Sequence, residues 1–133
     1  MASYLYVVLD GTEYRVRVRA DNPLAESFRV ADGPNTTTML DGSELRDVLG
    51  TYYDHSLYVE EDPAHPDDYD AFYEAISAPV ASHDVVLPHG QGELNYTAKI
   101  TKGSRNLRGT LGGRRRWYGL QVGFETIKPQ REP

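Results

Sequence analysis

The sequence predicts one α+β domain, mainly β, built as a small β-barrel or sandwich of about seven strands with a single helix. Three observations predict this class: apolar and polar residues alternate in short segments, glycine-rich turns separate these segments, and one segment has helical spacing. The length of 133 residues suits one domain, 1–133, with a sizeable core. The absence of cysteine excludes a disulfide framework and a cysteine-ligated zinc.

Residues 1–19 are predicted to form an N-terminal β-hairpin. Asp10-Gly11 is a strong two-residue turn signal, because both positions must take a positive φ. Pairing the strands about this turn gathers the apolar residues on one face, and a shift by one residue would scramble the pattern. The other face then sets Tyr4 against Arg17 and Tyr6 against Arg15.

Residues 43–127 are predicted to form the barrel with its helix. The segment from Leu45 to Glu60 is predicted as a long strand bent near Gly50. A helix over about 67–77 follows, because Pro66 suits a first helical position and the next residues are acidic. Its apolar stripe consists of Tyr69, Phe72, Tyr73 and Ile76.

The remaining strands lie after the helix. Residues 84–87, 94–100 and 105–110 have extended patterns separated by turns. In the last strand, alternation predicts Leu120, Val122 and Phe124 on the core face with Tyr118, and Trp117 on the opposite face. Residues 128–133 are predicted to be a C-terminal tail.

The net charge of −6 is unevenly distributed along the chain. Residues 41–93 hold thirteen acidic residues and one basic residue, a net charge of −12. Residues 99–133 hold nine basic and two acidic residues, a net charge of +7. We predict that these two regions form opposite contact surfaces, so that neighbouring copies meet head to tail.

No catalytic signature is present, so we expect no enzyme activity, no cofactor and no metal. The four histidines do not form a metal-binding spacing, and three of them flank turns, where a hydrated imidazole is unremarkable. No serine lies in a nucleophile-elbow context. No apolar run approaches the roughly 20 residues of a membrane-spanning helix, so we expect no membrane contact.

Arginine and aromatic residues mark the candidate interface. Both types are enriched at protein–protein hot spots. Basic residues among aromatics could also hold a phosphate backbone and stack bases, but the acidic chain makes nucleic acid an unlikely partner. The candidate interface residues are Tyr4, Tyr6, Arg15, Arg17, Arg105, Arg108, Arg114, Arg115, Arg116 and Trp117.

The order of these elements resembles that of small virion proteins of long-tailed bacteriophages. The resemblance covers residues 43–129: the segment 43–51, the strand at 57–59, the helix at 67–76, the strand at 96–100 and the strand at 117–124 before Pro129. In these tail-tube, tail-terminator and baseplate-hub proteins, a β-barrel with one flanking helix assembles into rings. The resemblance implies a non-enzymatic structural role in a virion tail, with synthesis in the bacterial host cytoplasm.

The expected partners are therefore copies of this chain in a ring and other virion proteins. The alternative left open by the sequence is a stand-alone β-barrel binding module for nucleic acid or carbohydrate. In that alternative, the arginines from Arg105 to Arg116 and Trp117 line one groove.

Overall fold

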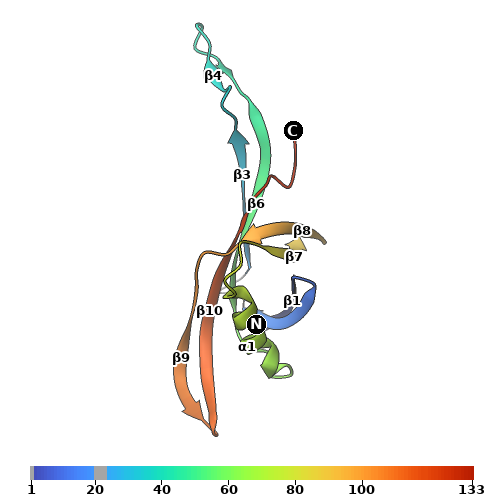
Figure 1. The fold of residues 1–133 in the computed structure, drawn as a ribbon, viewed down its shortest axis with the longest axis vertical. Helices are drawn as coiled ribbons and strands as arrows, with labels where there is room; N and C mark the ends of the chain where they lie inside the picture. The colour runs from blue at the N-terminus through green and yellow to red at the C-terminus, as the bar shows by residue number, and fades with distance from the viewer. Residues whose placement is uncertain (1, 20–23) are drawn as a thin grey trace.

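The computed structural model describes residues 2–19 and 24–133, and the side chains of 7–18 and 24–133. Over this part of the chain it is mainly β with one helix, so the predicted α+β class is confirmed (Figure 1). The strands and the helix are β1 (Ala2–Leu9), β2 (Thr12–Arg19), β3 (Ala25–Asp32), β4 (Thr37–Thr38), β5 (Glu44–Leu45), β6 (Val48–Val59), α1 (Pro66–Ile76), β7 (His83–His89), β8 (Gly92–Lys99), β9 (Gly103–Leu111) and β10 (Arg114–Thr126).

The N-terminal hairpin forms as predicted. Asp10 and Gly11 take φ angles of 51° and 83°, which is the conformation that a tight hairpin turn of this kind requires. Tyr4 pairs with Arg17 and Tyr6 with Arg15, in the predicted register. The side chains of Tyr4 and Tyr6 lie outside the described residues.

The hairpin, the central strands and the helix share one core. The helix begins at Pro66, and Tyr69, Phe72 and Ile76 of the predicted stripe are buried. The ring of Phe72 lies 5.5 Å from that of Tyr14 in β2, so the helix covers the hairpin side of the sheet. The buried residues of this core are Val7, Leu9, Val16, Leu57, Val59, Tyr69, Phe72, Ile76, Val85, Leu87, Tyr96, Ala98, Leu120, Val122 and Phe124.

The main sheet is not closed into a barrel. Its strand order is β2-β1-β7-β8-β10-β6-β3, with β9 attached to β10, and β4 and β5 form a separate two-stranded sheet. The described chain thus has more strands than the seven expected. Of the two predicted architectures, the closed barrel does not form, and a sandwich or open sheet fits. The physical reason is that β3 and β9 extend away from the body with long parts of β6 and β10 and do not complete a ring. The sheet approaches closure at one point, where Arg17 and Glu60 exchange two backbone hydrogen bonds of 3.0 and 2.9 Å.

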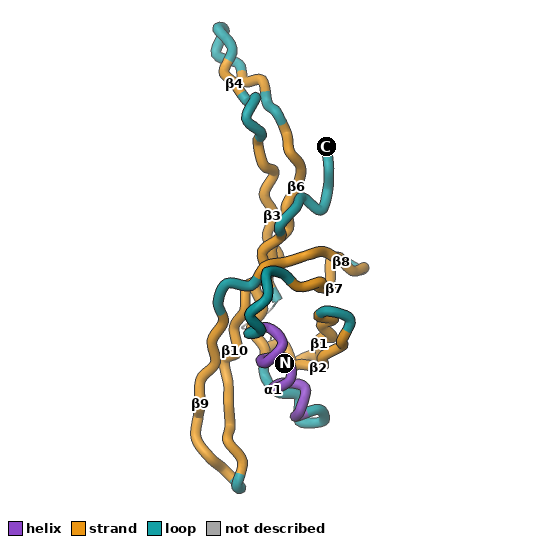
Figure 2. Tube along the Cα trace, viewed as in Figure 1, coloured by secondary structure: helices purple, strands orange, loops and turns teal. Residues whose placement is uncertain are grey.

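Two long hairpins project from the body at opposite ends (Figures 1 and 2). The first arm, residues 25–54, consists of β3 paired with the first part of β6 and ends in the β4–β5 tip. The second arm, residues 103–119, consists of β9 paired with the first part of β10. The predicted bend near Gly50 is confirmed, because Leu49 is an extra residue opposite the step from Ala31 to Asp32.

A bulge in β10 changes which side chains face the core. Tyr118 pairs with Asn106 whereas Gln121 pairs with Ser104, so β10 carries one extra residue there. Gly119 takes φ +67° at this bulge. The alternation therefore reverses, and the predicted placement of Trp117 and Tyr118 is wrong. Trp117 packs against the core and Tyr118 is exposed.

We expect Gly119→Val to destabilise the fold by about 1–3 kcal/mol. A Cβ at this position would have a strained φ and would lie 3.0 Å from Tyr58 Oη and 3.1 Å from Asn106 Nδ2. Urea denaturation measures the change in free energy of unfolding. Gly123→Ala is the matched control, because a Cβ there meets no described atom within 4 Å. Equal stability of the two variants would contradict the role of the bulge.

Candidate assembly interface

The first arm exposes large apolar side chains along its length and at its tip. Phe28 of β3 is 71% exposed, and Leu40 at the tip is fully exposed. The other exposed apolar residues of this arm are Val30, Met39, Leu45 and Leu49. Exposed apolar side chains that cluster on a projecting element are typical of a surface that a partner covers.

The second arm combines exposed apolar residues with the arginine cluster. Leu111 is 70% exposed, and Leu107 and Tyr118 are also exposed. The arm turns at Gly112-Gly113, where both φ angles are positive. All five candidate arginines of residues 105–116 lie on this arm, so the structure brings this part of the predicted interface together.

The five arginines have different surroundings. The Arg108 guanidinium lies 4.8 Å from the Tyr118 ring centroid, and Arg114 forms an ion pair with Glu61. Arg115 and Arg116 are exposed and form no ion pair with any residue in the described part of the chain. Together with the exposed Arg108, these two are the arginines of the arm for which no ion pair is found in the described chain.

Arg105 connects the second arm to the helix. Its guanidinium lies 3.8 Å from the Tyr73 ring centroid and 4.2 Å from that of Trp117, and Nη1 donates a hydrogen bond of 2.8 Å to Asp70 Oδ1. The Arg105 side chain is only 13% exposed. A planar cation between two aromatic rings and a carboxylate satisfies both its charge and its apolar faces. Arg105 thus holds the arm to the body and leaves little surface for a partner.

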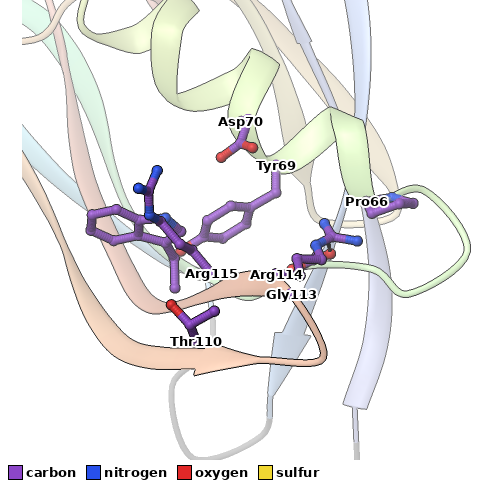
Figure 3. Close-up of a pocket in the computed structure, with 9 residues that line it drawn as sticks. Pro66, Tyr69, Asp70, Thr110, Gly113, Arg114 and Arg115 are labelled. Atoms are coloured by element: carbon purple, nitrogen blue, oxygen red, sulfur yellow. Dashed lines mark hydrogen bonds and ion pairs between the residues drawn. The ribbon is translucent and has the colours of Figure 1, made fainter.

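A hollow of about 540 Å³ lies between α1 and the second arm (Figure 3). Arg114, Arg115 and Thr110 line it from the arm, and Tyr69 and Asp70 line it from the helix. The Tyr69 hydroxyl is buried and has no hydrogen-bond partner among the described residues. Burial raises the pKa of Tyr69 to about 12, so the hydroxyl keeps its proton and is a hydrogen-bond donor.

The hairpin arginines lie near the start of the helix and not on either arm. The backbone N–H of Arg15 donates a 3.0 Å hydrogen bond to Asp68 Oδ2, and Arg15 Nη1 lies 3.0 Å from His65 Nε2. Arg17 exchanges its backbone hydrogen bonds with Glu60. The structure therefore divides the predicted interface residues between two places, the second arm and the hairpin.

A partly buried polar network at the root of the first arm was not predicted from the sequence. His55 Nε2 lies 2.9 Å and His89 Nδ1 lies 2.7 Å from the same oxygen, Glu26 Oε2. On its other side, His55 Nδ1 lies 2.8 Å from Tyr96 Oη. A neutral His55 that donates from Nε2 to Glu26 accepts the Tyr96 proton at Nδ1. The network joins β3, β6, β7 and β8. Because His55 is buried, this network suits a structural link between the strands better than contact with a substrate.

The four histidines are held by acidic side chains of the fold. All four are within hydrogen-bond distance of a carboxylate, and His55 and His83 are buried. His83 Nδ1 lies 2.6 Å from Asp10 Oδ2, which follows β1 at the hairpin turn. The partners of His55, His83 and His89 are 29 to 73 residues away along the chain, so no local pattern could identify them, whereas Asp62 lies only three residues before His65. No cluster suited to a metal ion is found among the residues with described side chains.

The C-terminal tail lies along the first arm. The Thr51 N–H donates a 2.7 Å hydrogen bond to the Arg131 carbonyl, and the Gln130 side chain bonds both the N–H and the C=O of Tyr53. A Cβ at Gly50 would lie 2.6 Å from the Arg131 carbonyl oxygen, so glycine permits this close approach. The tail thus stiffens the first arm where it leaves the body.

Comparison with known proteins finds no matching protein-family model and no similar curated protein. Within residues 2–19 and 24–133, no helix has the length and apolar character needed to cross a membrane.

We expect Arg105→Ala to lower the free energy of unfolding by about 1–2 kcal/mol, through loss of the ring contacts and of the apolar packing of the stem. The measurement is urea denaturation. Arg116→Ala is the matched control on the same arm, and we expect a change within about 0.5 kcal/mol because its side chain is exposed. The role of Arg105 is refuted when both variants are equally stable.

We expect acid to destabilise the protein through the His55 network. Burial lowers the pKa of His55 below its ordinary value of 6.5, so the folded state takes up this proton less readily than the unfolded state does. Partial burial raises the pKa of Glu26, but hydrogen bonds from His89 and His55 outweigh it, and the pKa lies below its ordinary value of 4.5. The free energy of unfolding should therefore fall as the pH drops below about 6.5, and again as it drops through the Glu26 range.

Urea denaturation at about pH 7.5 and 5.5 measures the first of these two losses. His55→Gln should show a smaller loss than the wild type over this interval, because the titrating group is absent. His65→Gln is the control, since His65 lies outside the network and pairs with Asp62. A wild type that is equally stable at both pH values contradicts the prediction.

Proposed function

We propose that this protein is a non-enzymatic structural component of a phage or prophage virion, in the tail or baseplate, that assembles as a ring. Its partners are copies of itself and other virion proteins, and it reaches the virion tail after synthesis in the bacterial host cytoplasm. The proposal is supported by the resemblance in element order and by the exposed apolar side chains of the two arms.

The observation that carries the proposal is the contrast between the body and the arms. The body has a continuous core in which fifteen apolar residues are buried. The arms are two-stranded over much of their length and expose Phe28, Leu40, Leu107 and Leu111 to solvent. A two-stranded ribbon is marginally stable in water, and it gains stability when a partner covers its apolar face.

The direction of the arms supports a closed assembly. They project from opposite ends of the molecule, so one copy offers two different surfaces to its neighbours (Figure 1). A contact between two different surfaces closes into a ring when the rotation between subunits permits it. The second arm carries five arginines and no acidic residue, which suits a neighbour with acidic surface.

The alternative is a binding module for nucleic acid or carbohydrate, and Arg115, Arg116 and the half-buried Trp117 support it. Arg105 and Arg114 are already paired with carboxylates, which weakens it. Fluorescence polarisation with single-stranded DNA at two salt concentrations separates the functions, because phosphate contacts weaken as salt rises. Absence of binding at low salt would exclude a function in binding nucleic acid.

We expect size-exclusion chromatography with light scattering to give a mass several times that of one chain. Arg115→Glu/Arg116→Glu should weaken assembly at least tenfold in subunit concentration while leaving the fold intact, because neither side chain has an ion pair in the described chain. Arg114 is left unchanged because it pairs with Glu61. A wild type that stays monomeric at high concentration, and is absent from purified virions by mass spectrometry, would overturn the proposed function.

A further inference from the structure

We propose that the tip of the first arm of one copy docks in the hollow between α1 and the second arm of the next copy. The tip comprises residues 36–45, and the hollow is the one lined by Tyr69, Thr110 and Arg115. This inference rests on the proposed assembly of the protein and names the contact that would form it.

The tip has an apolar end with acidic residues beside it. Met39, Leu40 and Leu45 are exposed, and Asp41 and Glu44 give the tip a charge of −2. The turn is held in shape by its own hydrogen bonds: Met39 N–H donates to the Ser43 carbonyl at 2.6 Å, and Ser43 N–H donates to Asp41 Oδ1 at 2.9 Å. A preformed turn loses little conformational entropy when it docks.

The groups left unsatisfied in the hollow favour an acidic partner. Its two carboxylates, Glu61 and Asp70, are engaged by Arg114 and Arg105. Arg115 carries no ion pair in the described chain, and the Tyr69 hydroxyl has no acceptor there. A guanidinium and a hydroxyl donor both attract a carboxylate. The volume of about 540 Å³ is in the range that accommodates several side chains.

The occupant must come from another copy. The tip and the hollow lie toward opposite ends of the long axis, so the tip cannot reach the hollow of its own chain (Figure 1). On the second arm, Thr110 and Arg115 line the hollow and point towards the helix (Figure 3). The contact therefore joins unlike surfaces, as a ring of identical subunits requires.

Disulfide trapping tests the contact, and the absence of cysteine in the chain removes any background. Leu40→Cys and Thr110→Cys are prepared as separate proteins, mixed and oxidised. We expect a cross-linked pair of chains on a non-reducing gel, at least tenfold more abundant than in a mixture of Leu40→Cys with Gln91→Cys. Gln91 is exposed in the turn between β7 and β8, outside both the tip and the hollow, and serves as the control.

A charge exchange tests the same contact without cysteine. Glu44→Arg and Arg115→Glu should each raise the subunit concentration needed for assembly about tenfold, and mixing the two variants should restore assembly to within about threefold of the wild type. The fold of each variant is checked by circular dichroism and urea denaturation.

The outcomes separate this inference from the proposed function. Selective cross-linking together with rescue by charge exchange supports the docking. Assembly by light scattering without selective cross-linking, or without rescue, overturns the docking and leaves the proposed assembly standing. A wild type that binds single-stranded DNA and does not assemble overturns both.

Discussion

The pairing of β6 with β10 is the constraint on which the shape of the molecule depends. Residues 55–59 of β6 lie antiparallel to residues 120–124 of β10, and both segments contribute buried side chains to the core. In each strand the paired segment follows a long first part that leaves the body. Because the strands run in opposite directions, these first parts project from opposite ends. One antiparallel pairing therefore produces both arms and the elongated outline in Figure 1.

Each arm is fastened at its root by a different chemistry. The first arm is held by the hydrogen bonds of Glu26 with His55 and His89, and by the tail segment around Gln130. The second arm is held by Arg105, which lies between Tyr73 and Trp117. The first set contains histidine and carboxylate groups, which change charge when the pH falls, whereas an arginine keeps its charge over the whole accessible range. Acid should therefore loosen the first arm before it affects the second.

The body and the arms differ in how far they bury their apolar side chains and pair their charged ones. Apolar side chains of the body are enclosed by the curled sheet and α1. Along the arms the same kinds of side chain remain exposed, and Arg115 and Arg116 have no ion pair in the described chain. A protein that buries its core but exposes apolar side chains and unpaired arginines on its projecting arms is suited to assembly with neighbours. This difference supports assembly with neighbours, which the proposed virion role and the proposed docking of the tip both require.

The sequence by itself determined the local elements of this protein. The Asp10-Gly11 hairpin with its register, the helix with its buried stripe and the irregularity near Gly50 all follow from turn chemistry and periodicity, which act over a few residues. Only the tertiary structure decided that the sheet stays open and that Trp117 faces the core, since one extra residue at Gly119 reverses the alternation. It also decided the partners of the histidines and of Arg105, because Arg105 and Asp70, or His83 and Asp10, are 35 and 73 residues apart and meet only when the strands pair.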